Sequence, residues 1–577
     1  MRKALCGLIF LIGCQYLRAQ TTITGGTAVS GLWTLAGSPY ILQGAVMVAD
    51  DSTLTIQPGV QVIFQGSYKF LVLGRMIAVG TPFDSISFTC SNASVGWLGI
   101  HFDNTTNNND TSLFSYCKIQ HTINSTANGG ALYFNNYSKG IIMNCTVSDN
   151  QFSNVNSGGG ITNVNSAPVV RFNTIKNNGC AGIYGPFNNS TSYVISDNTV
   201  INNQGYGIYS GNATITNNVI MHNASGGIMC NDATITNNTI DGNGALSGNT
   251  GGIGCASGSV QVIKNNIISN NRANQGGGIF CQWSQPVTLE DNIISNNQAG
   301  TNGGGLLCGA DINANNNTFT NNTAGNGGGI YSVYGGNSSL TNNTLANNEA
   351  SFGGGIYFTS SSTTNTVNIS NCILWGNNAS SSGNQVYIDV QTSKPNFSFC
   401  DLEGGSAAIG LASNVFYLGT YTNNMSSDPV FVAPSVSAGS SSNGVAANWS
   451  LQSSSPCING GNPSGTYPLT DLAGNPRVAS TIIDIGAYEF QGNVGVKENL
   501  FTDILLGPNP ATDVIFIQNL SGAITLAKVY DLDGNVVAEK TFTTKTDLVI
   551  SGLKAGIYFV EMNTNGASVK KKLVVAR

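Results

Sequence analysis

Side chains that could carry out acid–base chemistry are sparse in this sequence. Of 577 residues, 28 are Asp or Glu, 22 are Lys or Arg and 3 are His. Cleavage of a glycosidic bond needs two carboxyl groups at a suitable separation, or a base beside a cation that neutralises an acidic sugar. Glu290 and Asp291 are adjacent carboxylates, but neighbouring residues of a strand point to opposite faces. We therefore expect that these two do not act together directly.

The remaining charged residues favour structural roles. Lys264 and Glu290 occupy one position of an internal repeat in successive copies, which predicts an ordinary cross-strand ion pair. Asp484 and Glu489 lie beyond the repeats, where we expect them to help close the last of the repeated units. We assign no catalytic residue.

Metal-ligating residues show no grouping either. The three histidines, His101, His121 and His222, fall in separate repeats, and no zinc-protease motif or phosphate-binding loop is present. Four cysteines share one repeat position: Cys230, Cys255, Cys281 and Cys308. Because no His or acidic residue accompanies them, they predict a column of buried thiols and not a metal site. We assign no metal and no cofactor.

Aromatic residues offer a candidate binding surface. Each repeat contains an inward aliphatic residue, so the next residue should point outward. Aromatic residues hold this outward position in six repeats: Tyr133, Tyr184, Tyr209, Phe280, Tyr331 and Tyr357. Such rings could stack on sugar rings, or pack against a partner or a neighbouring loop. Strands also favour aromatic residues without any ligand, so both interpretations stay open.

These residues are positioned by a repeat. In residues 321–358 the pattern "NNTA…GGGIY" returns as "NNTL…GGGIY". A glycine-led aliphatic recurs from Leu132 to Ile356 at an average spacing of about 25 residues, a period typical of solenoids. The recurring positions are rich in β-branched residues and have no helical period. Coils of short strands that stack into a parallel β-helix are therefore predicted.

The asparagines and glycines of the repeat have separate roles. An Asn precedes the buried aliphatic by two positions, as Asn238 precedes Ile240, so it faces inward at a turn. Stacked amides about 4.8 Å apart can hydrogen-bond to one another and to the turn backbone. The glycines permit positive φ and close chain approach at the next corner.

Cysteine replaces this inward Asn at both ends of the array. Cys117 and Cys145 hold the position in the first two coils, and Cys372 and Cys400 hold it in the last two. In-register neighbours have Cα separations that a disulfide tolerates, and a secreted chain meets an oxidising compartment. Bridges Cys117–Cys145 and Cys372–Cys400 are one hypothesis, and buried thiols that replace Asn are the other.

Composition and the N-terminus indicate secretion. Charged residues make up 9% of the chain, Gly numbers 72, and the net charge of −6 with no basic stripe argues against a nucleic-acid partner. Residues 1–20 have the pattern of a signal peptide, with cleavage favoured near Ala19. The alternative is lipidation of Cys14, since "LIGC" resembles a lipobox. No later apolar run is long enough to span a membrane.

The flanks of the array resemble known families. "GLWTLAGSPYILQGAVMVADDSTLTIQPGVQVIFQG" looks like the opening of bacterial right-handed β-helix surface proteins, whose repeats the array also resembles. "DPVF", "SPCINGG" and "DLAGNPRVASTIIDIGAYEF" resemble the choice-of-anchor tail of such proteins. We therefore expect N-terminal coils in 21–116, regular coils in 117–402 and a variant terminal region in 403–490. All-β architecture, a right-handed parallel β-helix followed by a small β-sandwich, is the predicted fold class.

The C-terminus is similar to the type IX secretion C-terminal sorting domain. Alternating strands in 499–577 follow a linker at 491–498. The matching residues are Pro508, Asn509, Pro510, Tyr530, Gly534, Leu553, Gly556, Tyr558 and Lys570–Lys572. The resemblance implies export by the type IX machinery, removal of the domain by its sorting peptidase, and an extracellular or cell-surface location.

Three functions remain open on these grounds. The favoured one is a secreted adhesin or glycan-binding protein, with a polysaccharide or a host or cell-surface glycan as its ligand. The second is a polysaccharide lyase or glycoside hydrolase, because many parallel β-helix proteins have these activities. The third is a passive surface or matrix protein, which would have no specific ligand.

Overall fold

The structure is a computed structural model that describes residues 20–492 and 504–575 with short interruptions. These interruptions are residues 107, 125–128, 153–157, 189–190, 257–260, 282–285, 334–336, 361–365, 466, 480–481, 508, 510, 520–524, 532–534 and 565–566. The predicted signal peptide and Cys14 lie outside the described residues. The chain divides into a unit that ends at Gln491 and a second unit from Gly492 to Arg577.

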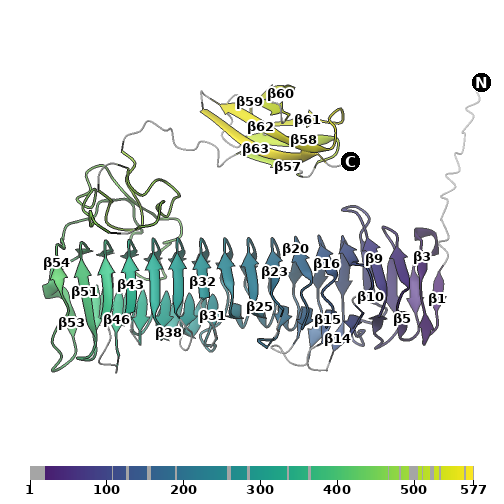
Figure 1. The fold of residues 1–577 in the computed structure, drawn as a ribbon, viewed down its shortest axis with the longest axis horizontal. Helices are drawn as coiled ribbons and strands as arrows, with labels where there is room; N and C mark the ends of the chain where they lie inside the picture. The colour runs from purple at the N-terminus through teal and green to yellow at the C-terminus, as the bar shows by residue number, and fades with distance from the viewer. Residues whose placement is uncertain are drawn as a thin grey trace, which may run out of the picture. The chain divides into compact units, whose positions relative to one another are not determined.

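The first unit is a parallel β-helix built from three 16-stranded sheets (Figure 1). Sheet 1 runs from β1 (Thr21–Ile23) to β52 (Asp401–Leu402), sheet 2 from β2 (Thr27–Ala28) to β53 (Gly410–Leu411), and sheet 3 from β3 (Gly31–Trp33) to β54 (Tyr421–Thr422). Each coil contributes one strand to each sheet in that order. Every pairing within the three sheets is parallel and joins successive coils, as the repeat predicts.

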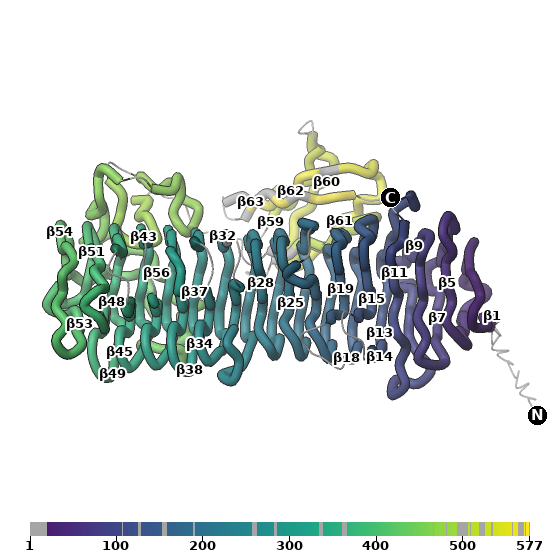
Figure 2. The backbone as a smooth tube through the Cα atoms, turned by 60° about the horizontal axis from the view of Figure 1, so that its bottom comes forward, coloured from purple at the N-terminus to yellow at the C-terminus, as the bar shows by residue number. Residues whose placement is uncertain are grey.

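One coil near the C-terminal end shows the repeat unit. It contains β41 (Thr318–Thr320) in sheet 1, β42 (Ile330–Ser332) in sheet 2 and β43 (Asn337–Thr341) in sheet 3. Extra paired strands, such as β45 (Glu349–Phe352) with β49 (Asn378–Ser382), lie between sheets 1 and 2 (Figure 2). The 3-10 helices among the described residues are η1 (Leu35–Gly37) and η2 (Gly405–Ala408).

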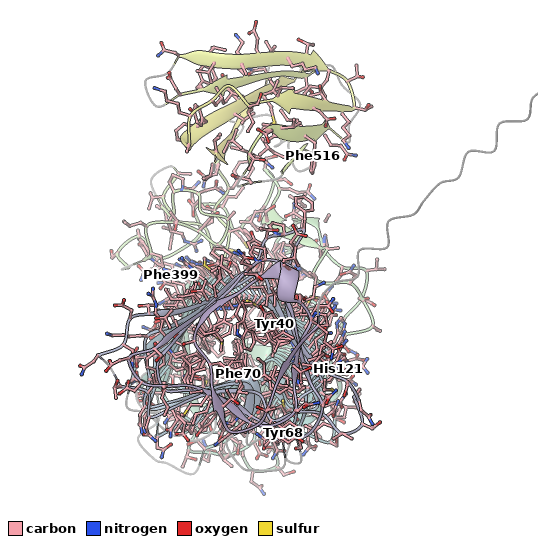
Figure 3. All side chains as sticks on the ribbon, turned by 90° about the vertical axis from the view of Figure 1, so that its right-hand side faces the viewer. Tyr40, Tyr68, Phe70, His121, Phe399 and Phe516 are labelled. Carbon is pink, nitrogen blue, oxygen red and sulfur yellow. The ribbon has the colours of Figure 1, made fainter. Side chains whose placement is uncertain are left out.

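Aliphatic residues fill the interior of most coils, and aromatic rings fill the N-terminal coils. Phe64 stacks on Trp97 with ring centroids 4.1 Å apart, and both are fully buried. Seen along the axis, side chains such as Tyr40 and Phe70 point into the space that the sheets enclose (Figure 3). The repeated aliphatics, for example Ile240, are fully buried as predicted. Burial of this continuous apolar column stabilises the stacking of coils.

The predicted asparagine ladder is confirmed. Asn218 donates from its backbone N and its Nδ2 to Oδ1 of Asn238 in the next coil, at 2.9 and 3.0 Å. Nδ2 of Asn238 also donates to the Ile215 carbonyl at 2.9 Å. A second inward ladder, which we did not predict from the sequence, follows five residues later in each coil: Asn150, Asn178, Asn203, Asn223, Asn243, Asn271, Asn297, Asn322, Asn348 and Asn377. Both ladders provide hydrogen-bond partners for buried backbone N–H and C=O groups at the corners of the coils.

Residues 428–490, the return segment, leave the helical path after β54. They fold back over the outer face of sheet 1 instead of forming further coils. Phe431, Trp449 and Ile485 of this segment form a second core with Ala346 and Ile373 of sheet 1.

Corner asparagines in the left-handed conformation hold the return segment. Asn347 (φ 52°) donates through Nδ2 to the Ser435 carbonyl at 3.0 Å. Asn321 (φ 55°) donates to the Ser437 carbonyl at 2.8 Å. Asn tolerates this left-handed conformation at tight corners. The side chains of these corner residues project outward and hydrogen-bond to the return segment.

The second unit contains two antiparallel sheets around its own core. One sheet joins β57 (Ile504–Gly507), β58 (Val514–Asn519) and β61 (Lys545–Val549), and the other joins β60 (Val536–Phe542), β59 (Thr525–Tyr530), β62 (Gly556–Thr564) and β63 (Ala567–Val575). Ile515, Val529 and Val560 are buried between them. This arrangement agrees with the predicted sandwich. Pro508, Pro510 and Gly534 of the predicted sorting motif lie outside the described residues.

Candidate functional site

The six predicted aromatic residues share one column on the outer face of sheet 2. Register pairs Tyr184 with Tyr209, and Tyr331 with Tyr357. Tyr133 pairs with Thr162, and Phe280 lies between Gly254 and Leu307. Non-aromatic neighbours therefore interrupt the column and divide it into separate groups.

Rings within each group stack on one another. Tyr184 and Tyr209 have centroids 5.2 Å apart, and Phe187 covers Tyr209 at 4.5 Å. Tyr133 lies 5.1 Å from the His101 ring. Because stacked rings use their faces on each other, they present mainly edges and hydroxyl groups outward. Tyr184, Tyr357 and Tyr387 are each only 8% exposed. The stacked rings therefore do not form a row of open faces on which sugar rings could stack.

The longest aromatic group combines rings with a carboxylate. Tyr331 and Tyr357 stack at 4.9 Å, and Tyr357 and Tyr387 stack at 5.2 Å. Asp389 accepts a hydrogen bond from Thr359 at 3.3 Å. Burial, together with the nearby Asp389 carboxylate, raises the pKa of the Tyr357 hydroxyl. These three tyrosines with Thr359 and Asp389 are called the tyrosine stack below.

Tyr387 was missed in the sequence because its repeat departs from the pattern. The aliphatic residue before it is Val386, which follows Gln385 instead of a glycine. The register of β46 (Ile356–Phe358) with β50 (Val386–Ile388) places Tyr387 beside Tyr357. The "VYI" segment was the available signal, since it matches "IYF" at the same point of the previous coil.

Lys264, Glu290 and Asp291 form one charged cluster. Lys264 Nζ lies 3.1 Å from Glu290 Oε1, which confirms the predicted pair, and 3.5 Å from Asp291 Oδ2. The expectation that the two carboxylates point to opposite faces is wrong, because both reach Lys264. Asp291 has φ 55°, so the strand ends there and the alternation of faces breaks.

Two carboxylates share the single Lys264 cation in this cluster. Burial lowers the pKa of Lys264, but the Glu290 and Asp291 carboxylates outweigh burial, so its pKa is raised overall. Burial raises the pKa of Asp291, and hydrogen bonds from Asn316 and Lys264 oppose that rise. The cluster could bind a charged group only by giving up its internal pairing.

Asp484 and Glu489 are structural residues of the return segment. Asp484 accepts hydrogen bonds from the backbone N atoms of Asn459 and Phe490, and Glu489 accepts from Ala479 and Asp484. Burial raises the pKa of Glu489 to about 7. Both side chains are at most 5% exposed, so they are not presented to a ligand. They order the return segment and do not close the last coil as we expected.

The hypothesised disulfides are not present in the structure. Cys117, Cys145, Cys372 and Cys400 are free thiols. Cys117 N donates to Cys145 Sγ at 3.4 Å, and Asn343 N donates to Cys372 Sγ at 3.4 Å, so the thiols replace Asn in the ladder. Parallel neighbours hold their Cβ atoms near the strand spacing of about 4.8 Å, beyond the roughly 3.8 Å typical of a disulfide.

Four further cysteines form the predicted internal column. Register aligns Cys230 with Cys255, and Cys281 with Cys308, and all four are at most 3% exposed. Within the described ranges, no group of three His, Cys, Asp or Glu side chains could hold a metal ion.

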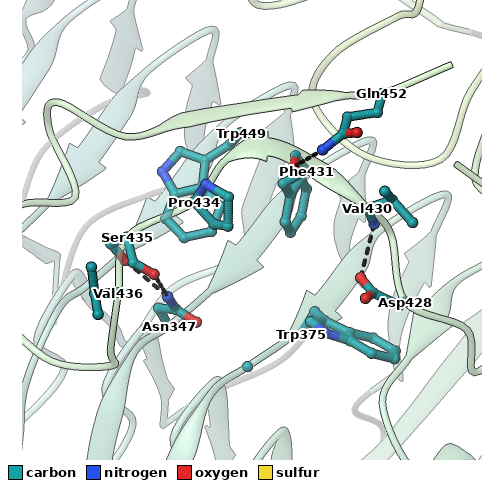
Figure 4. A pocket seen from close by; sticks show the side chains of 11 residues that line it. Asn347, Trp375, Asp428, Val430, Phe431, Pro434, Ser435, Val436, Trp449 and Gln452 are labelled. Atoms are coloured by element: carbon teal, nitrogen blue, oxygen red, sulfur yellow. Dashed lines mark hydrogen bonds between the residues drawn. The ribbon is translucent and has the colours of Figure 1, made fainter. Parts of the chain in front are cut away.

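A pocket of about 420 Å³, not predicted from the sequence, lies between the return segment and the end of β48 (Ile373–Trp375) (Figure 4). Its lining residues are Asn347, Trp375, Gly376, Asp428, Val430, Phe431, Pro434, Ser435, Val436, Trp449 and Gln452. No sequence signal could have joined Trp375 to Asp428, because the return path that brings them together is a tertiary feature.

Comparison with known families agrees with this architecture. The family model described as "Right handed beta helix region" matches residues 83–232 and 229–425, more than half of the chain. The chain belongs to the right-handed β-helix family. A second model, described as "Secretion system C-terminal sorting domain", matches residues 506–576. This right-handed β-helix protein is therefore a substrate of type IX secretion, destined for the cell surface or the extracellular space.

Other comparisons add no function for this β-helix protein. No curated protein matches the chain significantly. A similar solved structure is the enzymatically active domain of bacteriophage CBA120 tailspike protein 2, at 13% identity, with 92% of this chain and 72% of that chain covered and a TM-score of 0.17. A likeness at that score carries no argument. Within the part of the chain that the structure describes, no helix is long and apolar enough to cross a bilayer.

Proposed function

We propose that the mature protein is a secreted adhesin that binds a neutral glycan through the tyrosine stack. The observation that carries this proposal is the alignment of Tyr331, Tyr357 and Tyr387 beside Asp389 on a rigid sheet. Export would involve the type IX machinery, and its sorting peptidase would remove the second unit. The resemblance of the return segment to a choice-of-anchor tail remains a prediction.

The chemistry of the tyrosine stack fits sugar hydroxyl groups better than anionic sugars. Phenol hydroxyls repeat along the axis at the strand spacing, about 4.8 Å, and can donate or accept hydrogen bonds. The Asp389 carboxylate accepts hydrogen bonds but repels uronate and sulfate groups. Because β strands hold the rings, little side-chain entropy is lost on binding.

The test compares two phenylalanine variants of the full chain on a panel of neutral and acidic polysaccharides. A Tyr331→Phe/Tyr357→Phe/Tyr387→Phe variant keeps the rings and removes three hydroxyls. We expect at least tenfold weaker retention on a neutral polymer, about 1.4 kcal/mol. Tyr184→Phe/Tyr209→Phe is the matched control in another stack and should retain binding. Equal retention of both variants would contradict the proposal.

A polysaccharide-cleaving enzyme is the second candidate. The observation that favours it is the contact of Lys264 with both Glu290 and Asp291. New reducing ends or unsaturated uronates in the same panel, lost on Lys264→Ala, would establish this activity. Absence of both turnover and retention across the panel would leave a passive surface protein.

A further inference from the structure

The pocket at Trp375 is lined by β48 and the return segment, and it lies on a different sheet from the tyrosine stack. Trp375 ends β48 of sheet 1, and its side chain is half-buried at the base of the pocket. The opposite wall comes from the hairpin of β55 (Phe431–Ala433) and β56 (Asn448–Leu451). A volume of about 420 Å³ lies in the range of roughly 300–1,000 Å³ found for small-ligand sites.

The polar groups of this pocket are organised by the return segment. Asp428 accepts a hydrogen bond from Val430 N at 2.9 Å, and the side chain itself is exposed. Gln452 donates through Nε2 to the Phe431 carbonyl at 2.8 Å, which holds its amide at the rim. Figure 4 shows Asp428 and Trp375 on the same side of the cavity. The Trp375 indole and the Asp428 carboxylate therefore line one side of the pocket, and the Gln452 amide faces them from the wall that carries β56.

Backbone strain is stored at the same place. Among the described non-glycine residues with positive φ, Val430 (φ 51°) is the one β-branched residue. This conformation is unfavourable for a branched side chain. The Asp428 contact and the hydrogen bond from Gln452 N to the Val430 carbonyl at 3.0 Å hold it in place. The strained turn sets the position of Asp428.

A second hollow adjoins the first. It has a volume of about 230 Å³ and shares Pro434, Ser435 and Val436 with the Trp375 pocket. Val436 is fully exposed on the ridge between the two hollows. Two adjacent cavities separated by an apolar ridge match the repeating shape of an oligosaccharide, whose successive rings have apolar faces and polar rims.

We propose that the Trp375 pocket binds one pyranose ring of a neutral oligosaccharide and that the second hollow holds the next ring. The Trp375 indole supplies a face for the apolar side of the sugar, and Asp428 and Gln452 accept and donate hydrogen bonds to its hydroxyls. Asp428 is the sole charged residue of the lining, so anionic sugars are disfavoured. This site does not depend on the tyrosine stack.

The test titrates the full chain with neutral gluco- and manno-oligosaccharides of one to four units by calorimetry. We expect affinity to rise from one unit to two and to fall at least tenfold in Trp375→Ala. Asp428→Asn should weaken binding several-fold, and because this side chain is exposed, the variant should remain folded. Phe83→Ala, at an exposed aromatic residue outside both sites, is the control and should leave the affinity unchanged. Tyr331→Phe is titrated beside it to separate the tyrosine stack from the pocket.

Three outcomes would overturn this proposal. They are unchanged affinity in both pocket variants, tighter binding of oligogalacturonate than of neutral sugars, and no binding of any oligosaccharide by the folded chain. If Tyr331→Phe alone abolishes binding, the tyrosine stack is the site and the pocket proposal fails by itself. If only the pocket variants lose binding, the pocket stands and the proposed role of the tyrosine stack fails.

Discussion

Inward asparagines make the hydrogen bonds between coils at two corners of each coil. An amide both donates and accepts, so one side chain can satisfy backbone groups of the previous coil and bond to the amides of the coils on both sides. Asn292, for example, donates to the Ile263 carbonyl at 2.8 Å and to Asn317 Oδ1 at 2.9 Å. Its Oδ1 accepts from Asn266 N and Nδ2, both at 3.0 Å. Cysteine at the ladder ends makes longer contacts and is adequate only where the ladder stops.

Asn292→Ala should therefore lower the free energy of unfolding of the β-helix. The substitution leaves buried groups of Asn266, Asn317 and Ile263 without this partner, at about 1–3 kcal/mol for each unsatisfied group. Urea unfolding followed by circular dichroism measures the loss. Asn313→Ala, on the exposed face of sheet 3, is the control and should change stability by less than about 0.5 kcal/mol. A result in which the two variants match would contradict the ladder's role.

Glycine triplets before the strands of sheet 2 determine how closely neighbouring coils approach. A Cβ added at Gly329 would lie 2.6 Å from the Gly355 carbonyl oxygen of the next coil. At Gly305 the corresponding distance to the Gly329 oxygen is also 2.6 Å. Any larger residue at these positions would force the coils apart, which explains why the triplet returns in successive repeats.

Gly329→Ala should destabilise the solenoid by roughly 1–3 kcal/mol, because the packed backbone cannot move aside. Gly248→Ala is a suitable control, since its Cβ would meet its nearest neighbour, the Ala245 oxygen, at an ordinary 3.5 Å. Thermal unfolding of the two variants, compared with the wild type, measures the difference. Similar melting temperatures for both variants would show that close coil approach does not require this glycine.

The whole molecule combines a solenoid with a separately cored unit. Ile515 and Val560 belong to the core of the second unit, whereas the solenoid core extends from Val29 to Ile409. The match of residues 506–576 to a secretion sorting domain assigns the second unit to export. Binding is therefore expected to reside in the unit that ends at Gln491.

Deletion of residues 492–577 should stop export without unfolding the solenoid. The shortened chain should collect in the periplasm of a type IX-competent host, while the full chain reaches the medium or the cell surface. Cell fractionation with immunoblotting measures the distribution, and circular dichroism of the purified fragment checks its strands. Surface delivery of the shortened chain would contradict this division of roles.

Sequence alone determined the solenoid and the export unit. The 25-residue period, the inward Asn and the glycine triplets are local features that every coil repeats, so one coil's geometry predicts the next. Alternation along single strands also placed Tyr331 and Tyr357 on the outer face. The same logic predicted the Lys264–Glu290 pair, because both residues occupy one register position.

Tertiary structure decided what no single repeat contains. The left-handed corner at Asp291 turned its carboxylate toward Lys264, against the alternation of a strand. Parallel stacking kept Cys117 and Cys145 apart as thiols, since neighbouring Cβ atoms point the same way. The pocket between Trp375 and Asp428 exists because the return segment folds back over sheet 1 and binds its corner asparagines. Contacts between residues about 50 positions apart depend on that path, and a periodic pattern carries no information about it.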